Sequence, residues 1–526
     1  MISGSKKHFR RIIMMPGIII KKIARSSLIL LALVLSGCTD LSIENEVDTL
    51  SGDFFQTDED YIQFSAPAYI TMRQLTNSNS LLALQEISSD EMCIPTRGNE
   101  WYDGGQWLRL HRHKWYPEDQ TISSTWRFLY DGINTCNRLM RALEELGGEN
   151  GDTFIAELRA LRGLFYFWLL DLFGNVPIVT SYNQFQMPET STRAELYDFI
   201  LNELGEIKSK LSKEAGETYG RINYYVVEAL LAQLYLNQEV YTGTTNWPEV
   251  IKHCDEIIES GQYNLDPDYF AVFESENASS QEIIFSIPYD PENAPGLNIG
   301  MMTLHPANKR TYQLISEPWN GWCTIADFFH SYDNSDLRKG EGNSRGSFIY
   351  GQQFTKDGDT LYDDTSNLNL PYYDPDGLAV FLTPQIRSLD SAYRQDGARV
   401  GKYEIKGNSD LNMGNDFPVF RYARVLLMKA EALWRLDQSQ DALNLVNQVR
   451  RRAGLSDLLN LDQNEFIDEL GREFFMEAHR RTDLIRFGKF VDAWWEKPES
   501  ANCMTLFPIP QDQLIEQPEL IQNPCY

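Results

Sequence analysis

The sequence predicts a mainly α-helical fold, in which tetratricopeptide-like helical pairs support long, loop-rich insertions. Several segments repeat apolar residues every three or four positions, which is typical of helices with one buried face. Two of these segments are followed, after a short turn, by a second helix, giving units of about 35–40 residues, the size of a tetratricopeptide-type repeat. A long intervening region lacks such periodicity and is rich in Gly, Pro, Asn, Asp and aromatic residues.

The predicted helices follow in chain order. The first covers residues 155–174, IAELRALRGLFYFWLLDLFG. The second covers 222–241 and is followed after a turn by 247–261, and the third covers 420–436 and is followed by 441–455. Because these units lie far apart in the chain, we expect a helical scaffold interrupted by insertions rather than a continuous array of repeats.

The aperiodic region covers about 290–415 and contains turn dipeptides such as Asp-Gly at 357–358 and 376–377. This composition favours ordered loops and short strands packed on the scaffold. Binding residues tend to lie on such loops. We therefore expect this insertion to form the ligand face.

The first 37 residues have the pattern of an export signal. Lys21, Lys22 and Arg25 precede the apolar run SSLILLALVL, which is too short to span a bilayer, and the ending LSGC matches a bacterial lipobox. We predict a lipoprotein signal peptide over 1–37 and lipid attachment to Cys38. Translation from Met14 or Met15 would retain a complete signal, so the start stays open.

Acidic residues outnumber basic ones in the chain, 75 to 47. Removing residues 1–37 takes away seven basic side chains and no acidic one, so the formal net charge changes from −28 to −35. Such a charge repels nucleic-acid phosphates and anionic lipid headgroups. Nucleic acid is therefore not expected as a partner, and the lipid is expected to hold the protein to its membrane.

Six cysteines follow Cys38 at irregular spacing: Cys93, Cys136, Cys254, Cys323, Cys503 and Cys525. None forms a C-x-x-C pair, which argues against a zinc site or a redox motif. A chain of this length does not need disulfides to build a core. We expect most of these cysteines to be buried free thiols.

The stretch TRGNEWYDGGQWLRLHRHKW (96–115) carries several candidates for a functional site. His111 and His113 suggest a metal site, but two imidazoles lack a third ligand, and structural or solvated histidines are favoured. The acidic clusters at 332–336 and 356–364 supply oxygen ligands at short spacing without the twelve-residue calcium loop. We predict no metal site and no cofactor, and leave open a structural calcium ion at these clusters.

The segment EAHRRTDLIRFG places Arg480, Arg481 and Arg486 near Asp483. The arginines could clamp a carboxylate or a phosphate. However, Glu473, Glu477 and Asp483 lie at three- and four-residue offsets from them, which favours internal ion pairs. We expect these pairs to tie the last helix to the scaffold.

Several local patterns together resemble the SusD/RagB outer-membrane lipoproteins of Bacteroidetes. They occur in the family's order along 38–526: ISSDEM at 87–92, LRALRGLFYFWLLDLFGNVPIV at 158–179, NGWCTIADFF at 320–329, REFFMEAHRRTDLIRFG at 472–488, and FPIPQDQ…QNPCY at 507–526. The last segment has Cys525 where the family usually has Gly. The lipobox agrees with this resemblance independently.

The resemblance implies a cell-surface lipoprotein that binds a glycan, less often a peptide, and covers a SusC-like TonB-dependent outer-membrane transporter as a hinged lid. It also implies one SusD-like domain over 38–526, with helical repeats at about 126–261 and 420–490. Four tetratricopeptide-like pairs are expected, and 126–146 would belong to the fourth. No catalytic residues are expected.

Aromatic faces pack on the C–H surfaces of sugar rings, while amide, carboxylate and guanidinium groups meet the hydroxyls. The family's NGW segment nominates Trp322, and Trp101 follows the SDE segment among residues that are costly to bury. The candidate glycan-binding residues are Trp101, Trp322, Arg97, Asn99, Tyr102, Asp103 and Asn320.

Two departures from the starch-binding member argue against starch as the ligand. The stretch APGLNIGMM before NGW has no aromatic residue, and the arginine that precedes SDE is missing, its counterpart falling near Asn79. Two alternatives remain open. One is a surface glycoside hydrolase that uses Glu100 and Asp103 as paired carboxylates. The other is a SusD-like lid for peptide ligands.

Overall fold

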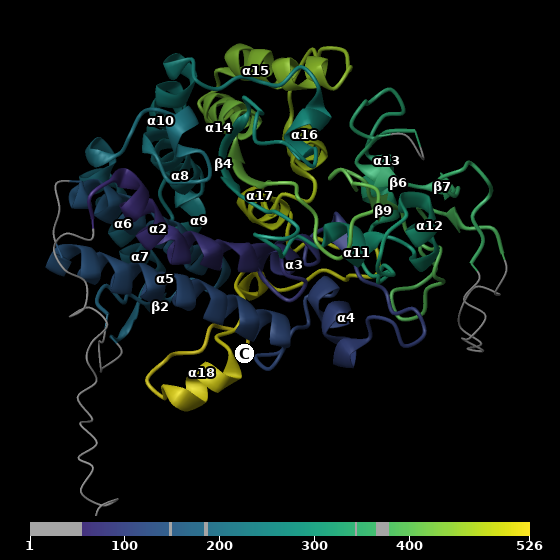
Figure 1. The fold of residues 1–526 in the computed structure, drawn as a ribbon, viewed down its shortest axis with the longest axis horizontal. Coiled ribbons are helices and arrows are strands. Elements are labelled where there is room, and N and C mark those ends of the chain that lie inside the picture. Colours follow the sequence, from purple (N-terminus) through teal and green to yellow (C-terminus); the bar gives the residue numbers. More distant parts are fainter. Residues whose placement is uncertain (1–54, 147–149, 183–187, 342–344, 364–377) are drawn as a thin grey trace, which may run out of the picture. The chain divides into compact units, whose positions relative to one another are not determined.

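Helices dominate the computed structural model, and most of them pack in pairs (Figure 1). The structure describes residues 55–146, 150–182, 188–341, 345–363 and 378–526. Residues Phe55–Tyr526 form one unit, and the predicted signal peptide and Cys38 lie outside the described residues. Among the described residues, no helix has both the length and the apolar character needed to span a membrane.

Helices dominate the described residues of the first half of the chain. It contains α2 (Asp58–Thr71), α3 (Leu81–Glu86), α4 (Gln106–His111), α5 (Gln120–Leu146), α6 (Gly151–Leu172), α7 (Arg193–Ile207), α8 (Tyr224–Leu236), α9 (Gln238–Thr242) and α10 (Trp247–Ser260). Helix α7 begins with a capping box between Thr192 and Glu195, and α10 ends at Gly261, whose φ of 65° suits a glycine.

The second half returns to helices after the insertion, with α14 (Tyr422–Arg435), α15 (Ser439–Arg452), α16 (Gln463–Phe474), α17 (Arg480–Arg486) and α18 (Gln511–Glu516). Successive helices pack against one another: α5 on α6, α6 on α7, α8 on α10, and α14 on α15. Helix α10 also packs on α14, which joins the two halves into one scaffold. The predicted helical-pair scaffold is confirmed, including the helix expected over 126–146.

The insertion between the two halves consists of loops and short elements. Its helices are α11 (Ile299–Thr303), α12 (Lys309–Tyr312) and α13 (Ala326–His330), and its strands are β5 (Cys323–Thr324), β6 (Phe348–Ile349), β7 (Gly351–Gln352), β8 (Phe381–Leu382) and β9 (Arg399–Val400). β4 (Ile283–Ile287) pairs antiparallel with β10 (Phe417–Arg421). The insertion therefore leaves the scaffold and returns to it at adjacent strands.

Three further pairings are antiparallel within the described residues of the insertion and its surroundings. β1 (Met92–Cys93) pairs with β5, β6 with β9, and β7 with β8. Near the scaffold, β2 (Val176–Pro177) pairs with β3 (Thr190–Ser191). The β1–β5 pair fastens the segment after α3 to the middle of the insertion.

Buried ion pairs connect α16, α17 and the chain between them to the scaffold. Arg421 on β10 pairs with Glu282, Glu473 and Glu477, all of which are buried. On α17, Arg486 pairs with Glu431 and Asp483, which also binds Arg424. The prediction of internal ion pairs is confirmed, but most partners lie on other elements rather than within the helix.

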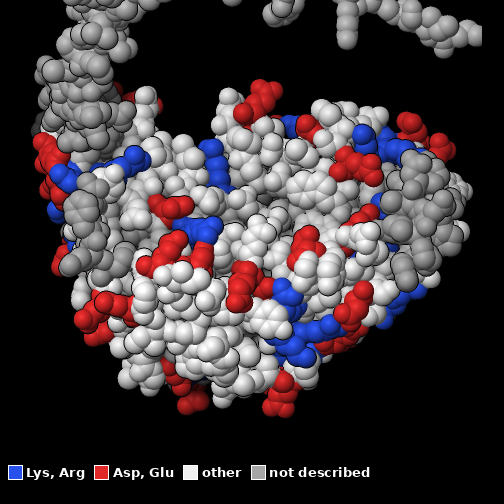
Figure 2. Space-filling view, turned by 90° about the horizontal axis from the view of Figure 1, so that it is seen from below, with Lys and Arg blue, Asp and Glu red and all other residues white. Residues whose placement is uncertain are grey.

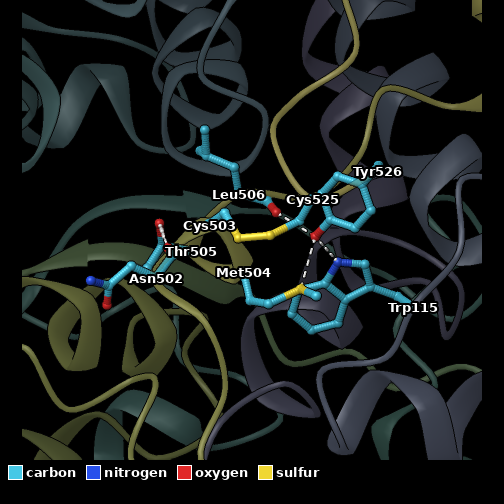
Figure 3. The surroundings of a disulfide bond; sticks show 8 residues. All are labelled: Trp115, Asn502, Cys503, Met504, Thr505, Leu506, Cys525 and Tyr526. Carbon is cyan, nitrogen blue, oxygen red and sulfur yellow. Dashed lines mark hydrogen bonds between the residues drawn. A yellow bond between two sulfur atoms is a disulfide. The ribbon is translucent and has the colours of Figure 1, made fainter.

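The chain ends in a disulfide between Cys503 and Cys525, whose Cα atoms are 6.0 Å apart (Figure 3). Beside it, the Tyr526 hydroxyl donates to the carbonyl oxygen of Leu506 at 2.9 Å and contacts the Trp115 indole. Cys93, Cys136, Cys254 and Cys323 are buried free thiols. The prediction for most cysteines is thus confirmed, while Cys503 and Cys525 form a bond that was not predicted.

Candidate functional site

Two loops from distant parts of the chain meet at Trp101. The first comprises residues 97–105, between β1 and α4, and the second comprises residues 319–322, directly before β5. The Trp101 indole N–H donates to the carbonyl oxygen of Trp319 at 2.6 Å. The Trp101 ring also lies on Gly321, where an added Cβ would come within 2.3 Å of it. Glycine at 321 is therefore required for this contact.

Arg97 holds the two loops together from beneath. It is fully buried, and its guanidinium donates to the carbonyl oxygens of Asn320 and Gly321, both at 2.9 Å. The same group donates to the carbonyl oxygens of Tyr393 and Asp396 and to the sulfur of Cys323. Arg97 is thus a positioning residue, and the prediction that it binds the ligand directly is wrong.

Asn320 is also buried and has a structural role. Its φ of 56° turns the chain between the two tryptophans. Its side-chain oxygen accepts from Arg399 at 2.9 Å, and its amide donates to Glu100 at 3.3 Å. With both ends of the side chain engaged below the surface, Asn320 cannot contact a ligand as predicted.

Trp322 is buried, with 1 % of its surface exposed, and belongs to the main hydrophobic core. Its side chain presents no face to solvent on which a sugar ring could stack. The prediction that Trp322 is a sugar platform is therefore wrong. Residue type and motif could not reveal this, because burial depends on which distant segments pack around the ring.

Three aromatic side chains on these loops are accessible, and we call them the aromatic set: Trp101, Tyr102 and Trp319. Tyr102 is 53 % exposed, Trp319 is 38 % exposed, and Trp101 is partly buried. Trp319 was not predicted. Trp101 was nominated because its neighbours are polar residues and glycines. Trp319 has similar neighbours, since it stands among Pro, Asn and Gly residues.

The backbone of the first loop is held in an unusual conformation. Trp101 and Asp103 have φ values of 57° and 42°, in the left-handed region that non-glycine residues seldom adopt. Such conformations cost about 1–3 kcal/mol each and gather at ligand-binding sites. Asn99, also predicted to bind, is exposed at the tip of the turn formed by Arg97 and Glu100.

A polar hollow of about 390 Å³ lies at the start of α4, continuous with the first loop. Its lining consists of Asn79, Asp103, Gln106, Arg109, Glu118, Asp119 and Gln120. Arg109 pairs with Asp119, and its guanidinium lies 4.9 Å from the centre of the Tyr116 ring. Amides, carboxylates and a guanidinium thus converge beside the exposed Tyr102 and Tyr116, a combination that suits hydroxyl-rich ligands.

The surface around α4 and α18, at the bottom of Figure 1, carries acidic and basic side chains in small neighbouring groups between uncharged ones (Figure 2). The hollow follows the same pattern. Hydrogen bonding to Asp119 raises the pKa of Arg109, which keeps the guanidinium charged. The site is therefore polar and mixed in charge.

The two carboxylates nominated for hydrolysis are both engaged. Glu100 accepts from Arg394 at 3.0 Å and from the Asn320 amide. Asp103 accepts from the Trp107 indole N–H at 2.7 Å. Each holds a neighbouring side chain in place, which gives both a structural role.

His111 and His113 are buried and hydrogen-bonded, as the structural interpretation predicted. His111 contacts the carbonyl oxygen of Trp495 at 2.8 Å, and His113 that of Ser88 at 2.8 Å. Burial lowers the pKa of His111 to about 4 and that of His113 well below its ordinary value. Both imidazoles are therefore neutral near pH 7.

Several carboxylates of the acidic clusters make other contacts. Asp336 pairs with buried Arg338, Asp333 accepts from the backbone N–H and hydroxyl of Ser335, and Asp363 pairs with Arg394. Asp364 lies outside the described residues. Within the described part of the chain, no three His, Cys, Asp or Glu side chains are grouped so that they could hold a metal ion.

A paired-helix scaffold that holds an aromatic and polar loop face is the architecture that the resemblance implied, and two family models match the chain. The model described as the SusD family matches residues 390–526. A second, described as "Starch-binding associating with outer membrane", matches residues 65–236. The chain is therefore similar to SusD-family proteins in two separate regions, one in each half of the chain.

Relatives of this family align along most of the chain. "Starch-binding protein SusD" of Bacteroides thetaiotaomicron is 26 % identical over 484 residues, covering 81 % of this chain and 82 % of the relative. "SusD-like protein P38" of Formosa agariphila is 24 % identical and covers 96 % and 99 %. These identities are low, so ligand contacts cannot be transferred residue by residue.

Solved structures show the same fold. Surface glycan-binding protein A from Bacteroides thetaiotaomicron, in complex with laminarihexaose, superposes with a TM-score of 0.71 at 24 % identity, covering 89 % of this chain and 99 % of that one. A SusD superfamily protein from Parabacteroides distasonis has a TM-score of 0.71 at 20 % identity. The predicted SusD-like fold is therefore confirmed.

Proposed function

We propose that this protein is a lipid-anchored, cell-surface glycan-binding protein of the outer membrane. It captures an oligosaccharide or polysaccharide and delivers it to a SusC-like TonB-dependent transporter, without cleaving it. One observation carries the proposal: the aromatic set stands on two loops that buried Arg97 and Asn320 hold rigid, next to the polar hollow. Flat rings beside fixed hydrogen-bonding groups match the chemistry of sugars.

The comparisons support this proposal at the level of the family. One relative is named for starch binding, one structural neighbour was solved with laminarihexaose, and one family model is described by association with the outer membrane. The missing arginine and the missing aromatic before NGW favour a glycan other than starch. Trp319 gives this chain an exposed ring in the second loop although Trp322 is buried.

The engaged carboxylates argue against the hydrolase alternative. Glu100 and Asp103 are held by Arg394, Asn320 and Trp107, so neither is positioned as a free acid or base. The peptide-lid alternative has the same scaffold and differs only in the ligand. We favour the glycan because amides and carboxylates line the hollow without an apolar pocket for peptide side chains.

The test is native affinity electrophoresis of the mature protein in gels containing starch, laminarin or other plant, fungal and host glycans, followed by calorimetry on the best ligand. Because stacked rings at the centre of a site contribute on the order of 1.4 kcal/mol or more, Trp101→Ala and Trp319→Ala should each weaken binding about tenfold or more. Tyr182→Ala, at another exposed aromatic residue, is the matched control and should bind normally.

The outcomes separate the alternatives. Release of reducing ends during incubation would overturn the binding-only proposal. If Trp101→Ala and Trp319→Ala both bind the glycan normally, the aromatic set is not part of the binding site. If the protein binds peptides and no glycan, the alternative of a SusD-like lid for peptide ligands is favoured. Co-purification of a large β-barrel protein from detergent extracts tests the transporter partner.

A further inference from the structure

Two buried cysteines lie opposite each other beneath the candidate site. Cys93 on β1 and Cys323 on β5 are direct partners in the antiparallel register. Their sulfur atoms are 3.9 Å apart, and neither side chain is exposed. Directly opposed residues in antiparallel strands have Cα atoms about 4.5–5.5 Å apart, within the range of about 4.4–6.8 Å that disulfides span.

In the folded chain, the surroundings of Cys323 favour a negative charge on its sulfur. The Arg97 guanidinium donates to the Cys323 sulfur at 3.4 Å, and Arg399 is packed against the same site. Within the described residues, neither arginine forms an ion pair with a carboxylate. Two buried cations thus face a pair of sulfurs, and the nearby positive charge stabilises a negative charge on Cys323.

Cys136 and Cys254 provide a contrast within the same chain. Both are buried free thiols; burial raises the pKa of Cys136 to about 12, and it also raises the pKa of Cys254 above its ordinary value. At Cys323, burial also raises the pKa, but the contact from Cys93 and the charges of Arg97 and Arg399 outweigh it and lower the pKa. Among the described free thiols, only the Cys93–Cys323 pair combines a partner sulfur with neighbouring cations.

We propose that Cys93 and Cys323 form a disulfide in the exported protein, and that this bond fastens the two site loops at their bases. Cys93 lies four residues before Arg97, and Cys323 directly follows Trp322. A covalent link here restricts the separation of residues 97–105 from residues 319–322. Holding binding loops in place before the ligand arrives reduces the entropy lost on binding.

The oxidation proceeds by thiol–disulfide exchange with a disulfide-bearing oxidoreductase or a small-molecule disulfide. The Cys323 thiolate attacks one sulfur of the oxidant, and the other sulfur leaves as a thiolate. The Cys93 sulfur, deprotonated, then attacks the mixed disulfide at Cys323 and releases the second thiol of the oxidant. The cysteines lose two protons and two electrons, and the oxidant gains them. Since both sulfurs are buried in the folded chain, exchange takes place before β1 and β5 pair.

In the test, acid first stops thiol–disulfide exchange in the mature protein. N-ethylmaleimide in denaturant then alkylates every free thiol, and the protein is digested with trypsin. Trypsin places Cys93 in residues 74–97 and Cys323 in residues 311–338. We expect these two peptides to be linked until reduced, with only Cys136 and Cys254 alkylated. Refolding with oxidised glutathione should give the same link, and Cys93→Ser should leave Cys323 without an internal partner.

Three results would overturn the proposal. These are alkylation of both Cys93 and Cys323 after refolding with oxidant, separate glutathione adducts on each, or linkage of either to Cys136 or Cys254. A thermal readout is independent of the mapping. The Cys503→Ser/Cys525→Gly variant lacks the C-terminal disulfide. In this variant, reduction should lower the midpoint temperature of thermal unfolding, and adding Cys93→Ser should abolish that decrease. The outcome does not depend on which ligand the protein binds.

Discussion

At the residue scale, two tryptophans three positions apart have opposite environments. Trp319 is accessible and Trp322 is in the core, although both lie in the short segment WNGW. The left-handed backbone at Asn320 turns the chain between them, and Arg97 fixes that turn by binding two of its carbonyl oxygens. The segment therefore supplies one ring for the surface and one for the core.

Glu86, which ends α3, and Glu91, in the segment ISSDEM, are buried acids that interact with each other. Burial raises the pKa of Glu86 to about 7, against the lowering effects of the Ala478 N–H and Lys402. Burial, together with Glu86, raises the pKa of Glu91 well above its ordinary value. The pair therefore retains a proton near neutral pH, and that proton satisfies oxygens that otherwise lack a partner.

This pair predicts a pH dependence of stability. Because the folded state binds the Glu86 proton more tightly than the unfolded chain does, stability falls as pH rises from about 4.5 to about 7. Glu86→Gln keeps the acceptor for Ala478 and has no proton to lose. Urea denaturation at about pH 5 and pH 8 should show a loss of unfolding free energy in the wild type, on the order of 1–3 kcal/mol, that is reduced in the variant.

Other carboxylates titrate in both the wild type and Glu86→Gln. The test is therefore the difference between the two proteins in how their unfolding free energy changes with pH. Glu259→Gln, at an exposed position on α10, is the matched control and should follow the wild type. An identical pH dependence in wild type and Glu86→Gln would contradict the assignment of a shared buried proton.

At the scale of elements, adjacent arginines at the end of α15 have different roles. The side chain of Arg452 is only 4 % exposed and pairs with Glu282, next to β4, and with Glu473 on α16. Arg451 is exposed and pairs with Asp457 on the following turn. Only Arg452 connects elements that are distant in the chain, so the two residues test whether the buried network holds the helices together.

Replacement of each arginine by methionine keeps a similar chain length and helix propensity. Arg452→Met leaves two buried carboxylates with one cation fewer, and removal of one partner from a buried pair costs about 3–5 kcal/mol. Chemical denaturation should show that loss. Arg451→Met should leave the midpoint unchanged, since exposed pairs contribute little. Equal effects of the two substitutions would show that the network is not what holds α15 to α16.

At the scale of the whole molecule, we predict that the lipid on Cys38 holds the protein to the membrane. A formal net charge of −35 after removal of residues 1–37 opposes binding to anionic lipids. We expect Cys38→Ala to move the protein from the membrane fraction to the soluble fraction, without lipid on the chain by mass spectrometry. Cys136→Ala should remain with the membrane. A Cys38→Ala protein that stays in the membrane fraction would contradict the lipid anchor.

Much of the architecture could be predicted because an amphipathic helix repeats apolar residues every three or four positions, a pattern visible within a short stretch of sequence. The three- and four-residue spacing marked 155–174, 222–241 and 420–436. The first lies largely in α6, the second is divided between α8 and α9, and the third lies largely in α14, with its first two residues in β10. The insertion was recognisable by the loss of that spacing. Its return to the scaffold through β4 and β10 was not recognisable, because antiparallel pairing joins residues more than a hundred positions apart.

The candidate site could be predicted only in part. The loop that carries Trp101, Tyr102 and Asp103 was found from its polar and glycine-rich surroundings. Arg97, Asn320 and Trp322 were assigned to the ligand, but all three are buried: Arg97 and Asn320 hold the loops, and Trp322 packs in the core. Trp319 and the polar hollow were missed.

The sequence by itself determined the helical scaffold, its interruption by an insertion and the resemblance to SusD-like proteins; the export signal with its lipobox stays a prediction from the sequence. Only the tertiary structure decided which aromatic rings face solvent and which cysteines stand opposite each other. The reason is physical. Helix periodicity and signal peptides depend on neighbours within a few residues, whereas burial and sulfur pairing depend on contacts such as Arg97 with Asn320 and Cys93 with Cys323, more than two hundred residues apart.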